Sequence, residues 1–312
     1  MTAFDYLIGI DGGGSKTTAR IAAPNGKVLA EASTGPSALA HGVEKAWPVI
    51  VDAIRLAFGS ANLAMPDYTK LAVGIGLAGM NVAHWAEQFR AGDPGFGALL
   101  VESDATTTLL GAHRGQQGAI IAIGTGTIGA AINPDGSQHI VDGWGFPSGD
   151  DASGAWMGLR AINQVQRFLD GRAATGPLVL DVIAFCVGND SVLAEPNDQD
   201  QTTREAVLNW LTRANQSLFA QLARLVVKHA DDDPAAHEIM TAAGAEIGLM
   251  AQALDPSEKL PLALCGGLAT SLRPYLPATL QKRTVPPWGD AASGALLMIQ
   301  RHLEKQPARS VF

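Results

Sequence analysis

The sequence predicts an α/β protein with two related domains that grip a ligand between them. Stretches with the hydrophobic spacing of strands alternate along the chain with stretches that have the spacing of helices, which is typical of the α/β class. Two similar glycine-rich hairpins lie about 113 residues apart, which indicates an internal repeat. The length of 312 residues is sufficient for two domains of ordinary size.

The first hairpin is the most informative segment. An apolar strand ends at Asp11 and is followed by three glycines and the polar run Ser15–Thr18. Glycine permits a left-handed turn in which successive N–H groups face an anion, and the Asp11 carboxylate suits a hydrated Mg²⁺. The segment differs from a Walker A loop, because Ser15 separates Gly14 from Lys16. We predict a phosphate clamp in a β-hairpin; an ordinary glycine-rich turn is the alternative.

Helices and buried strands follow in alternation. Before residue 115 we expect an amphipathic helix from Val43 to Phe58, strands at Leu71–Leu77 and Ala98–Val101, and a helix at Ala105–His113. Beyond it we expect helices at Ala152–Leu169, Pro177–Val187, Thr202–His229 (opened by a capping box of Thr202 and Glu205), Pro234–Leu254, Ser271–Leu276 and Ala291–Leu303, with a strand at Leu260–Leu264. The polar stretch 189–201 is expected to be a surface loop.

The second hairpin repeats the pattern of the first. A buried strand at Ala119–Ile123 leads into the polar turn Gly124–Thr127, and Ile128–Ile132 forms the return strand. We therefore expect each domain to offer one phosphate-binding turn, with the ligand gripped from both sides.

Asp104 is the candidate for chemistry. It follows a predicted parallel strand, and ligands in open α/β sheets bind beyond such carboxyl ends. There Asp104 could orient a hydroxyl nucleophile for phosphoryl transfer. The competing interpretation is an N-cap for the helix at Ala105–His113, and the two roles are compatible.

Three further glycine-rich segments have two interpretations each. The loop Asp142–Asp151 mixes acids, glycines and aromatics, which suits a carbohydrate, although a surface turn with a packed Trp also fits. The turn Cys265–Ala269 could let a flat base lie against the backbone, or be a simple tight turn. Small residues at Gly289–Ala295 favour close packing of the last helix.

Composition excludes several classes. A net charge of −8 without a basic cluster argues against nucleic-acid binding, and the apolar runs are too short to span a bilayer. The beginning of the sequence lacks a secretion signal, and two cysteines suggest a reducing compartment, so we expect a cytoplasmic protein. A dehydrogenase is a further alternative, because Gly74–Gly79 and Gly124–Gly129 both match the glycine spacing of a dinucleotide-binding turn. It is disfavoured, because neither segment shows the full fingerprint.

Taken in order, these segments resemble the acetate and sugar kinase/Hsp70/actin superfamily, and most closely the BadF/BadG/BcrA/BcrD ATPase family with its N-acetylglucosamine and glucosamine kinases. The matching segments span nearly the whole chain: Asp11–Thr17, Ser103–Ala105, Gly124–Thr127, Gly143–Gly145, Gly149–Asp150 and Cys265–Gly267. The resemblance implies two ribonuclease-H-like (actin-like ATPase) domains flanking a nucleotide cleft. The first would comprise residues 1–115, joined by the C-terminal helix 291–312, and the second residues 116–290.

The resemblance also implies roles for individual residues. Asp11 would hold Mg²⁺, and Asp104 would contact the sugar and accept the proton of its 6-hydroxyl. Contacts to ATP would come from Gly12, Gly13, Gly14, Ser15, Lys16, Thr17, Thr125, Gly126, Thr127, Gly266 and Gly267. The remaining contacts to the sugar would come from Ser37, Gly143, Trp144, Gly145 and Asp150.

The implied activity is ATP-dependent phosphorylation of the 6-hydroxyl of N-acetylglucosamine by a homodimer. Some N-acetylglucosamine kinases of the family place an Asn and an aromatic after a Gly-Pro-Ser turn, whereas here Ala38–Ala40 follow Gly35–Ser37, so glucosamine is the alternative. A non-catalytic ATP-binding regulator or an ATPase activator is the further alternative. The activators bind an iron–sulfur cluster through cysteines at a dimer interface, and the two isolated cysteines here, Cys186 and Cys265, argue against that role.

Overall fold

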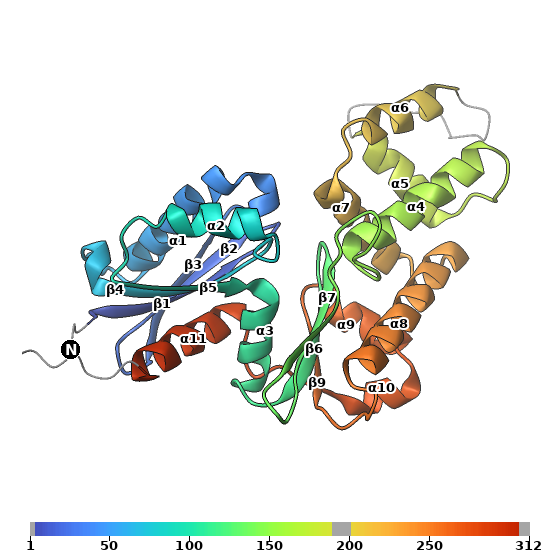
Figure 1. The fold of residues 1–312 in the computed structure, drawn as a ribbon. Helices are drawn as coiled ribbons and strands as arrows, with labels where there is room; N and C mark the ends of the chain where they lie inside the picture. Colours follow the sequence, from blue (N-terminus) through green and yellow to red (C-terminus); the bar gives the residue numbers. More distant parts are fainter. Residues whose placement is uncertain (1–3, 189–200, 306–312) are drawn as a thin grey trace, which may run out of the picture.

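Two five-stranded mixed sheets form the framework of the molecule (Figure 1). A computed structural model describes residues 4–188 and 201–305. The strand orders are β3-β2-β1-β4-β5 and β10-β9-β6-β7-β8. In both sheets the central strand pairs antiparallel with the next strand of its hairpin and parallel with a strand from later in the chain. The predicted α/β class is confirmed, and the shared topology accounts for the repeated hairpins.

The strands follow the expected alternation with small changes at their ends. The first sheet contains β1 (Tyr6–Gly12), β2 (Thr17–Ala22), β3 (Val28–Thr34), β4 (Leu71–Leu77) and β5 (Ala98–Ser103). The second sheet contains β6 (Gly118–Ile123), β7 (Thr127–Ile132), β8 (Gln138–Asp142), β9 (Leu262–Cys265) and β10 (Thr284–Val285).

The helices divide between the two sheets. Those associated with the first sheet are α1 (Val43–Ser60), α2 (Ala83–Ala91), α3 (Asp104–His113) and α11 (Ala291–Lys305), with the short 3₁₀ helices η1 (Leu39–His41) and η2 (Tyr68–Lys70). Those associated with the second sheet are α4 (Gly154–Leu169), α5 (Pro177–Val187), α6 (Gln201–Leu211), α7 (Gln216–Lys228), α8 (Pro234–Leu254), α9 (Ala269–Leu272), η3 (Arg273–Tyr275) and α10 (Ala278–Arg283).

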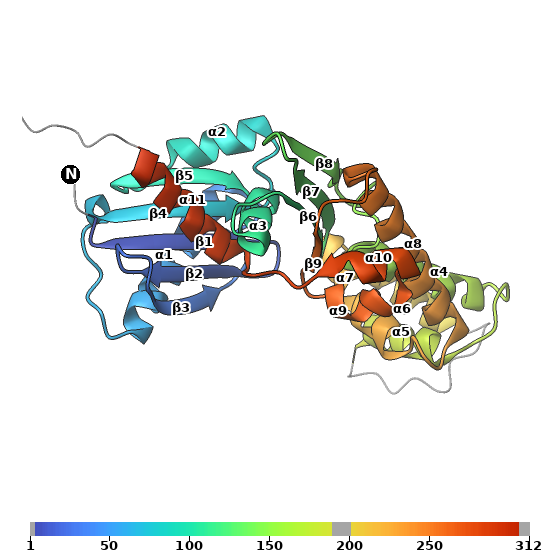
Figure 2. The same cartoon turned by 90° about the horizontal axis from the view of Figure 1, so that it is seen from below.

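Helices cover both faces of the first sheet (Figure 2). On one face, Ile50, Ile54 and Phe58 of α1 join buried residues of β1, β2 and β4 in a common core. The opposite face is covered by α11, which returns from the second sheet, together with α3. The domain boundaries after residues 115 and 290 stay a prediction, and this return of α11 supports them.

α3 lies between the two sheets. Its apolar residues pack against Ile120 of β6 and Ala130 of β7 in the second sheet. Toward the first sheet, a Cβ added to Gly76 of β4 would lie 1.8 Å from Oγ1 of Thr107 in α3, so the helix and the strand are in close contact. Because Asp104 is the first residue of α3, this packing fixes Asp104 at the junction of the two halves.

Small residues allow α11 to approach its neighbours closely. A Cβ on Gly294 of α11 would lie 1.8 Å from the carbonyl oxygen of Thr107, and a Cβ on Gly74 of β4 would lie 2.2 Å from that of Ala295. The close packing predicted for Gly289–Ala295 is confirmed. Gly74, which belongs to one of the two dinucleotide-like patterns, therefore has a packing role in this fold.

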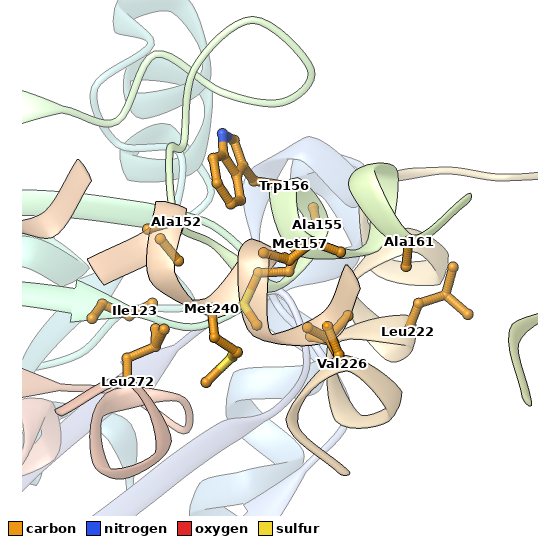
Figure 3. Packing of buried hydrophobic residues seen from close by; sticks show 14 of the residues in the cluster. Ile123, Ala152, Ala155, Trp156, Met157, Ala161, Leu222, Val226, Met240 and Leu272 are labelled. Carbon is orange, nitrogen blue, oxygen red and sulfur yellow. The ribbon is translucent and has the colours of Figure 1, made fainter. Parts of the chain in front are cut away.

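The largest core lies on the far side of the second sheet from α3 (Figure 3). Met157 of α4, Leu222 and Val226 of α7, Met240 of α8 and Ile123 at the end of β6 all belong to this core. This core holds the start of α4 and the start of α7 close to the second glycine turn. Within the described ranges, no helix combines the length and the apolar character needed to cross a bilayer.

Two expectations about helix ends were wrong. The helix predicted from Thr202 to His229 is broken into α6 and α7, because the Asn215 side chain accepts a hydrogen bond from the Leu218 N–H and starts a new helix. The capping box predicted at Thr202 and Glu205 was also wrong. α6 includes Gln201, so Thr202 lies within the helix and is not its N-cap. Most of the loop predicted at 189–201 lies outside the described residues.

Candidate functional site

The two glycine turns, from separate sheets, meet at their tips. The first, Gly12–Thr17, joins β1 to β2 and is closed by a hydrogen bond of 3.0 Å from the Gly13 N–H to the Lys16 carbonyl. The second, Gly124–Thr127, joins β6 to β7. The Oγ of Ser15 lies 3.1 Å from the Oγ1 of Thr125, so the tips of the two turns touch through their hydroxyl groups. Two sets of backbone N–H groups are therefore brought to one place by separate sheets.

The first turn is supported by the segment after β3. Thr17 Oγ1 donates a hydrogen bond of 2.7 Å to Ser37 Oγ, and the N–H groups of Ser37 and Ala38 each donate to the Gly13 carbonyl at 3.1 Å. Ser37 is only 2% exposed, so in this structure its hydroxyl is used to hold the turn. The contact of Ser37 with a sugar stays a prediction.

The second turn is supported by the start of α4. The N–H groups of Gly154 and Ala155 donate to the carbonyls of Gly124 and Thr125 at 2.8 and 3.2 Å. Thr127 follows the turn, and its Oγ1 is the one buried side-chain polar atom without a hydrogen-bond partner among the residues that the structure describes. A buried hydroxyl is seldom left in this state, so its position fits a polar ligand at the turn.

Asp11 lies at the end of β1 in an acidic environment. Burial, together with the smaller effect of the nearby carboxylates of Asp104 and Asp290, raises its pKa to about 6, whereas Lys16 and Arg20 oppose the shift. A buried carboxylate beside two others favours a bound cation, because a cation would offset their repulsion. The donor set at Asp11 therefore fits Mg²⁺.

The described residues contain no ready-made metal cage of three or more His, Cys, Asp or Glu side chains. Mg²⁺ does not require such a cage, because it keeps several waters and is commonly held by one or two carboxylates and by substrate phosphates. The exposed ammonium group of Lys16 and the open space around Gly14 leave room for phosphates beside Asp11.

Asp290 and Arg20 belong to the site but were missed from the sequence. Arg20 of β2 donates to both carboxylate oxygens of Asp290, at 2.6 and 2.7 Å, and it also pairs with Glu31. Burial opposes ionisation of Asp290, but the hydrogen bonds from Arg20 and Ser293 prevail and lower its pKa to about 2. No local pattern reveals this pair, because 270 residues separate its members.

Asp104 is the first residue of α3 and is half-buried. Ser103 is the N-cap, since its side chain accepts a hydrogen bond from the Thr106 N–H, and the suggestion that Asp104 is the cap was wrong. Asp104 Oδ1 accepts a hydrogen bond of 2.9 Å from the Ala105 N–H. Burial raises the pKa of Asp104 despite that bond, and the charge of Asp150 raises it further. Asp104 and Asp150 come from opposite halves of the molecule and are close enough for their charges to interact.

The loop predicted to bind sugar is built around carboxylates. Asp142 accepts hydrogen bonds from the N–H groups of Asp150 and Asp151 at 3.0 and 2.8 Å, which folds the loop back on the end of β8. Gly143 and Gly145 adopt left-handed conformations, with φ of 75° and 89°, that glycine tolerates best. Trp144 between them is 86% exposed and free to cover a ligand.

The turn Gly266–Gly267 is bound to the end of β6. The Leu268 N–H donates to the Ile123 carbonyl at 3.2 Å. Gly266 has a φ of 89°, and a Cβ there would lie 2.3 Å from that same oxygen, so only glycine fits. Gly267 has open space on its Cβ side. The surface predicted for adenosine therefore adjoins the second phosphate turn, since that turn follows Ile123 and the Gly266–Gly267 turn packs on the Ile123 carbonyl.

Two further residues were missed by the sequence analysis. Asp142 organises the acidic loop, and Gln216 donates a hydrogen bond of 2.8 Å from Nε2 to Oδ2 of Asp150. The end of a strand marks Asp142 as a candidate, but no sequence pattern links Gln216 to a residue that lies 66 positions away. The roles predicted for the individual site residues stay predictions, and the structure gathers most of these residues around the two glycine turns.

Comparison with known proteins assigns the family. A curated relative, a glucosamine kinase of Vibrio cholerae, is 32% identical over 94% of this chain and 95% of its own length. An N-acetylmuramic acid/N-acetylglucosamine kinase of Clostridium acetobutylicum is 30% identical over 58% of this chain and 60% of its own. A crystal structure from Chromobacterium violaceum, provisionally described as an N-acetylglucosamine kinase, superposes with a TM-score of 0.88 at 44% identity and covers 96% of this chain and 100% of that one.

The sequence model of the BadF/BadG/BcrA/BcrD ATPase family matches residues 8–298, which include both glycine turns and the start of α11. The family predicted from the motifs and the actin-like two-domain fold class are confirmed. This chain belongs to the BadF/BadG/BcrA/BcrD ATPase family.

Proposed function

We propose that this protein transfers the γ-phosphoryl group of ATP to the 6-hydroxyl of an amino sugar. Its enzyme class, a phosphotransferase with an alcohol acceptor, follows from its family and relatives. The observation that carries the proposal is the meeting of two glycine turns from separate sheets, with Ser15 and Thr125 3.1 Å apart. Half-buried Asp104 is near enough for its charge to act on both Asp11 and Asp150, so it lies where a nucleophile would be activated.

The proposed chemistry needs one proton acceptor and many donors. Asp104 accepts the proton of the 6-hydroxyl as the hydroxyl oxygen bonds to the γ-phosphorus and the bond from that phosphorus to the β–γ bridging oxygen breaks, releasing ADP. Burial raises the pKa of Asp104, which makes its carboxylate a better base at neutral pH. Backbone N–H groups of the two turns stabilise the charge on the transferred group. Mg²⁺, when bound near Asp11, supplies further neutralisation.

Charge favours glucosamine over N-acetylglucosamine as the substrate. Asp104, Asp142, Asp150 and Asp151 lie around the acidic loop, and none of them forms an ion pair within the described part of the chain. Glucosamine carries an ammonium group near neutral pH, whereas the acetylated sugar is neutral, so only glucosamine gains from this negative charge. The Vibrio cholerae relative, named a glucosamine kinase, agrees with this choice.

N-acetylglucosamine is the second candidate, as the sequence resemblance implies. The provisional description of the Chromobacterium violaceum structure supports it. Ser37 supports it less, because its buried hydroxyl is bonded to Thr17 and because Ala38–Ala40 offer no polar side chain for an acetyl group.

The test is ADP release in a coupled assay with glucosamine, N-acetylglucosamine, glucose or no sugar. We expect the highest kcat/KM with glucosamine and the 6-phosphate as product. ADP release of equal rate in all four reactions would instead indicate an ATPase activator, and ATP binding without release would indicate a regulator. Either result would refute the proposed function.

A further inference from the structure

Gln216 is the first residue of α7, and its side chain reaches the acidic loop that follows β8. Its Nε2 donates a hydrogen bond of 2.8 Å to Asp150 Oδ2, while the Gly145 N–H donates one of 3.0 Å to Oδ1. Each oxygen of Asp150 thus has one donor, and the two donors fix the plane of the carboxylate. Asp150 is only 6% exposed, so few other arrangements are available to it.

The same pair packs on the second phosphate turn. A Cβ added to Gly126 would lie 2.4 Å from Asp150 Oδ2 and 3.3 Å from Gln216 Nε2. The carboxylate and the amide therefore contact the backbone of Gly126 directly. Through this contact, Gln216 joins the loop proposed to bind sugar to the turn proposed to bind phosphate.

Gln216 is held rigidly. Asn215 caps α7 by accepting a hydrogen bond of 3.0 Å from the Leu218 N–H, which fixes the first turn of the helix. α7 packs tightly on α4, since a Cβ on Gly158 of α4 would lie 1.9 Å from the Phe219 carbonyl oxygen. Because the start of α4 also supports the second glycine turn, the amide, the carboxylate and the turn are held together by shared contacts.

A neutral donor has a particular advantage at this position. Burial raises the pKa of Asp150, and the charges of Asp142 and Asp151 raise it as well. Hydrogen bonds from the Gly145 N–H and the Gln216 amide oppose the rise. A Lys or Arg in place of the amide would cancel the charge of Asp150. The amide instead satisfies one oxygen and leaves the negative charge for a hydroxyl or ammonium group of the substrate.

We infer that Gln216 is a positioning residue for the amino sugar: it holds Asp150 ionised, and oriented toward the substrate, against the second phosphate turn. The inference rests on the proposed function, which it extends by one residue. It predicts a loss of sugar affinity when the amide is removed and little change in the affinity for nucleotide, because the Gln216 amide donates its hydrogen bond to Asp150 and not to the phosphate turn.

The first test is Gln216→Leu, which keeps a side chain of similar size and removes the donor. Because the lost hydrogen bond is one to a charged group, we expect the KM for the amino sugar to rise about 10-fold or more. The KM for ATP should change by less than about 3-fold. The matched control is Gln201→Leu, in the first turn of α6, where an exposed amide bonds to Glu205 at 3.2 Å; it should leave both constants unchanged.

The second test, Gln216→Glu, has a pH signature that a merely structural role would lack. Near neutral pH the introduced carboxylate faces Asp150 at hydrogen-bond distance, with Asp104, Asp142 and Asp151 close by, and the sugar KM should rise above that of the Leu variant. As the pH falls, the introduced carboxyl gains a proton and can donate it to Asp150. The ratio of the variant's sugar KM to that of the wild type should then fall with acidification, whereas the ratio for Gln216→Leu should stay flat.

The outcomes separate this inference from the proposed function. If the wild type phosphorylates an amino sugar and neither variant alters the sugar KM, the inference about Gln216 is overturned while the function stands. If the wild type shows no phosphorylation, the function fails, and calorimetric titration with glucosamine tests Gln216 alone: equal affinity of wild type and Gln216→Leu, or no binding to either, overturns the inference. If the Leu variant does not fold, the pH signature of Gln216→Glu decides.

Discussion

Replacement of Asp104 by Asn tests the proposed chemistry most directly. The Asn side chain has nearly the same shape, and its Oδ1 can still accept the 2.9 Å hydrogen bond from the Ala105 N–H, so α3 should start as before. Only the negative charge and the ability to take a proton are lost. A positioned general base contributes about 10²–10⁴-fold, or about 3–5 kcal/mol of the barrier, so we expect kcat to fall by that factor.

The same substitution should leave nucleotide binding intact. Asp104 is one of the carboxylates that raise the pKa of Asp11, and its removal makes Asp11 easier to ionise. The Kd for Mg²⁺–ATP, measured by calorimetry, should therefore stay the same or decrease. The control is Asp135→Asn, which changes an exposed carboxylate that accepts a hydrogen bond of 2.9 Å from the Ser137 N–H in a turn. Sugar kinase activity of Asp104→Asn within about 10-fold of the wild type would refute the assigned role.

Three other substitutions test the cleft and the fold. Asp11→Asn should weaken the binding of Mg²⁺–ATP. Because folding raises the pKa of Asp11 from 3.8 to about 6, the ligand-free wild type should become less stable as the pH rises from about 4 to 6. The thermal stability of the Asn variant should not show this loss. Gly126→Ala puts a Cβ 2.4 Å from Asp150 Oδ2. In steady-state assays, kcat/KM for the amino sugar and kcat/KM for ATP should each drop at least about 10-fold, with little change in Tm. Gly294→Ala puts a Cβ 1.8 Å from the Thr107 carbonyl, and calorimetry should show a loss of about 3 kcal/mol or more, or no folded protein.

The sequence was most informative where local and long-range demands agree. Strand β4 and helices α5 and α8 begin and end where the pattern predicts, since a buried apolar run or a proline at the first turn leaves little choice. Both glycine turns were also predictable, because closely spaced glycines between two apolar strands are typical of a tight turn that joins them. The contact between Ser15 and Thr125 places the two turns side by side, as the predicted clamp requires. It does not test the role of any single residue.

The errors have local physical causes. The break before α7 depends on Asn215, whose cap is hidden in a run with helical spacing, and the start of α3 depends on a choice between Ser103 and Asp104 that two adjacent good caps leave open. The pairs Arg20–Asp290 and Gln216–Asp150 could not be predicted at all. Their members are 270 and 66 residues apart, and only the packing of α11 and α7 brings them together.

The acidic cleft links stability to ligand binding. A rise of the Asp11 pKa from 3.8 to about 6 corresponds to about 3 kcal/mol lost at neutral pH when no cation is bound, which is a large share of the 5–15 kcal/mol by which proteins are stable. Asp104 and Asp150 add to that cost, because burial also raises their pKa values. A cation at Asp11 turns the destabilising effect of its negative charge into a stabilising one. Mg²⁺ with nucleotide should therefore raise the free energy of unfolding by more than the phosphate contacts of the nucleotide alone would. Charges that work against the empty fold therefore become the source of affinity once the cleft is filled.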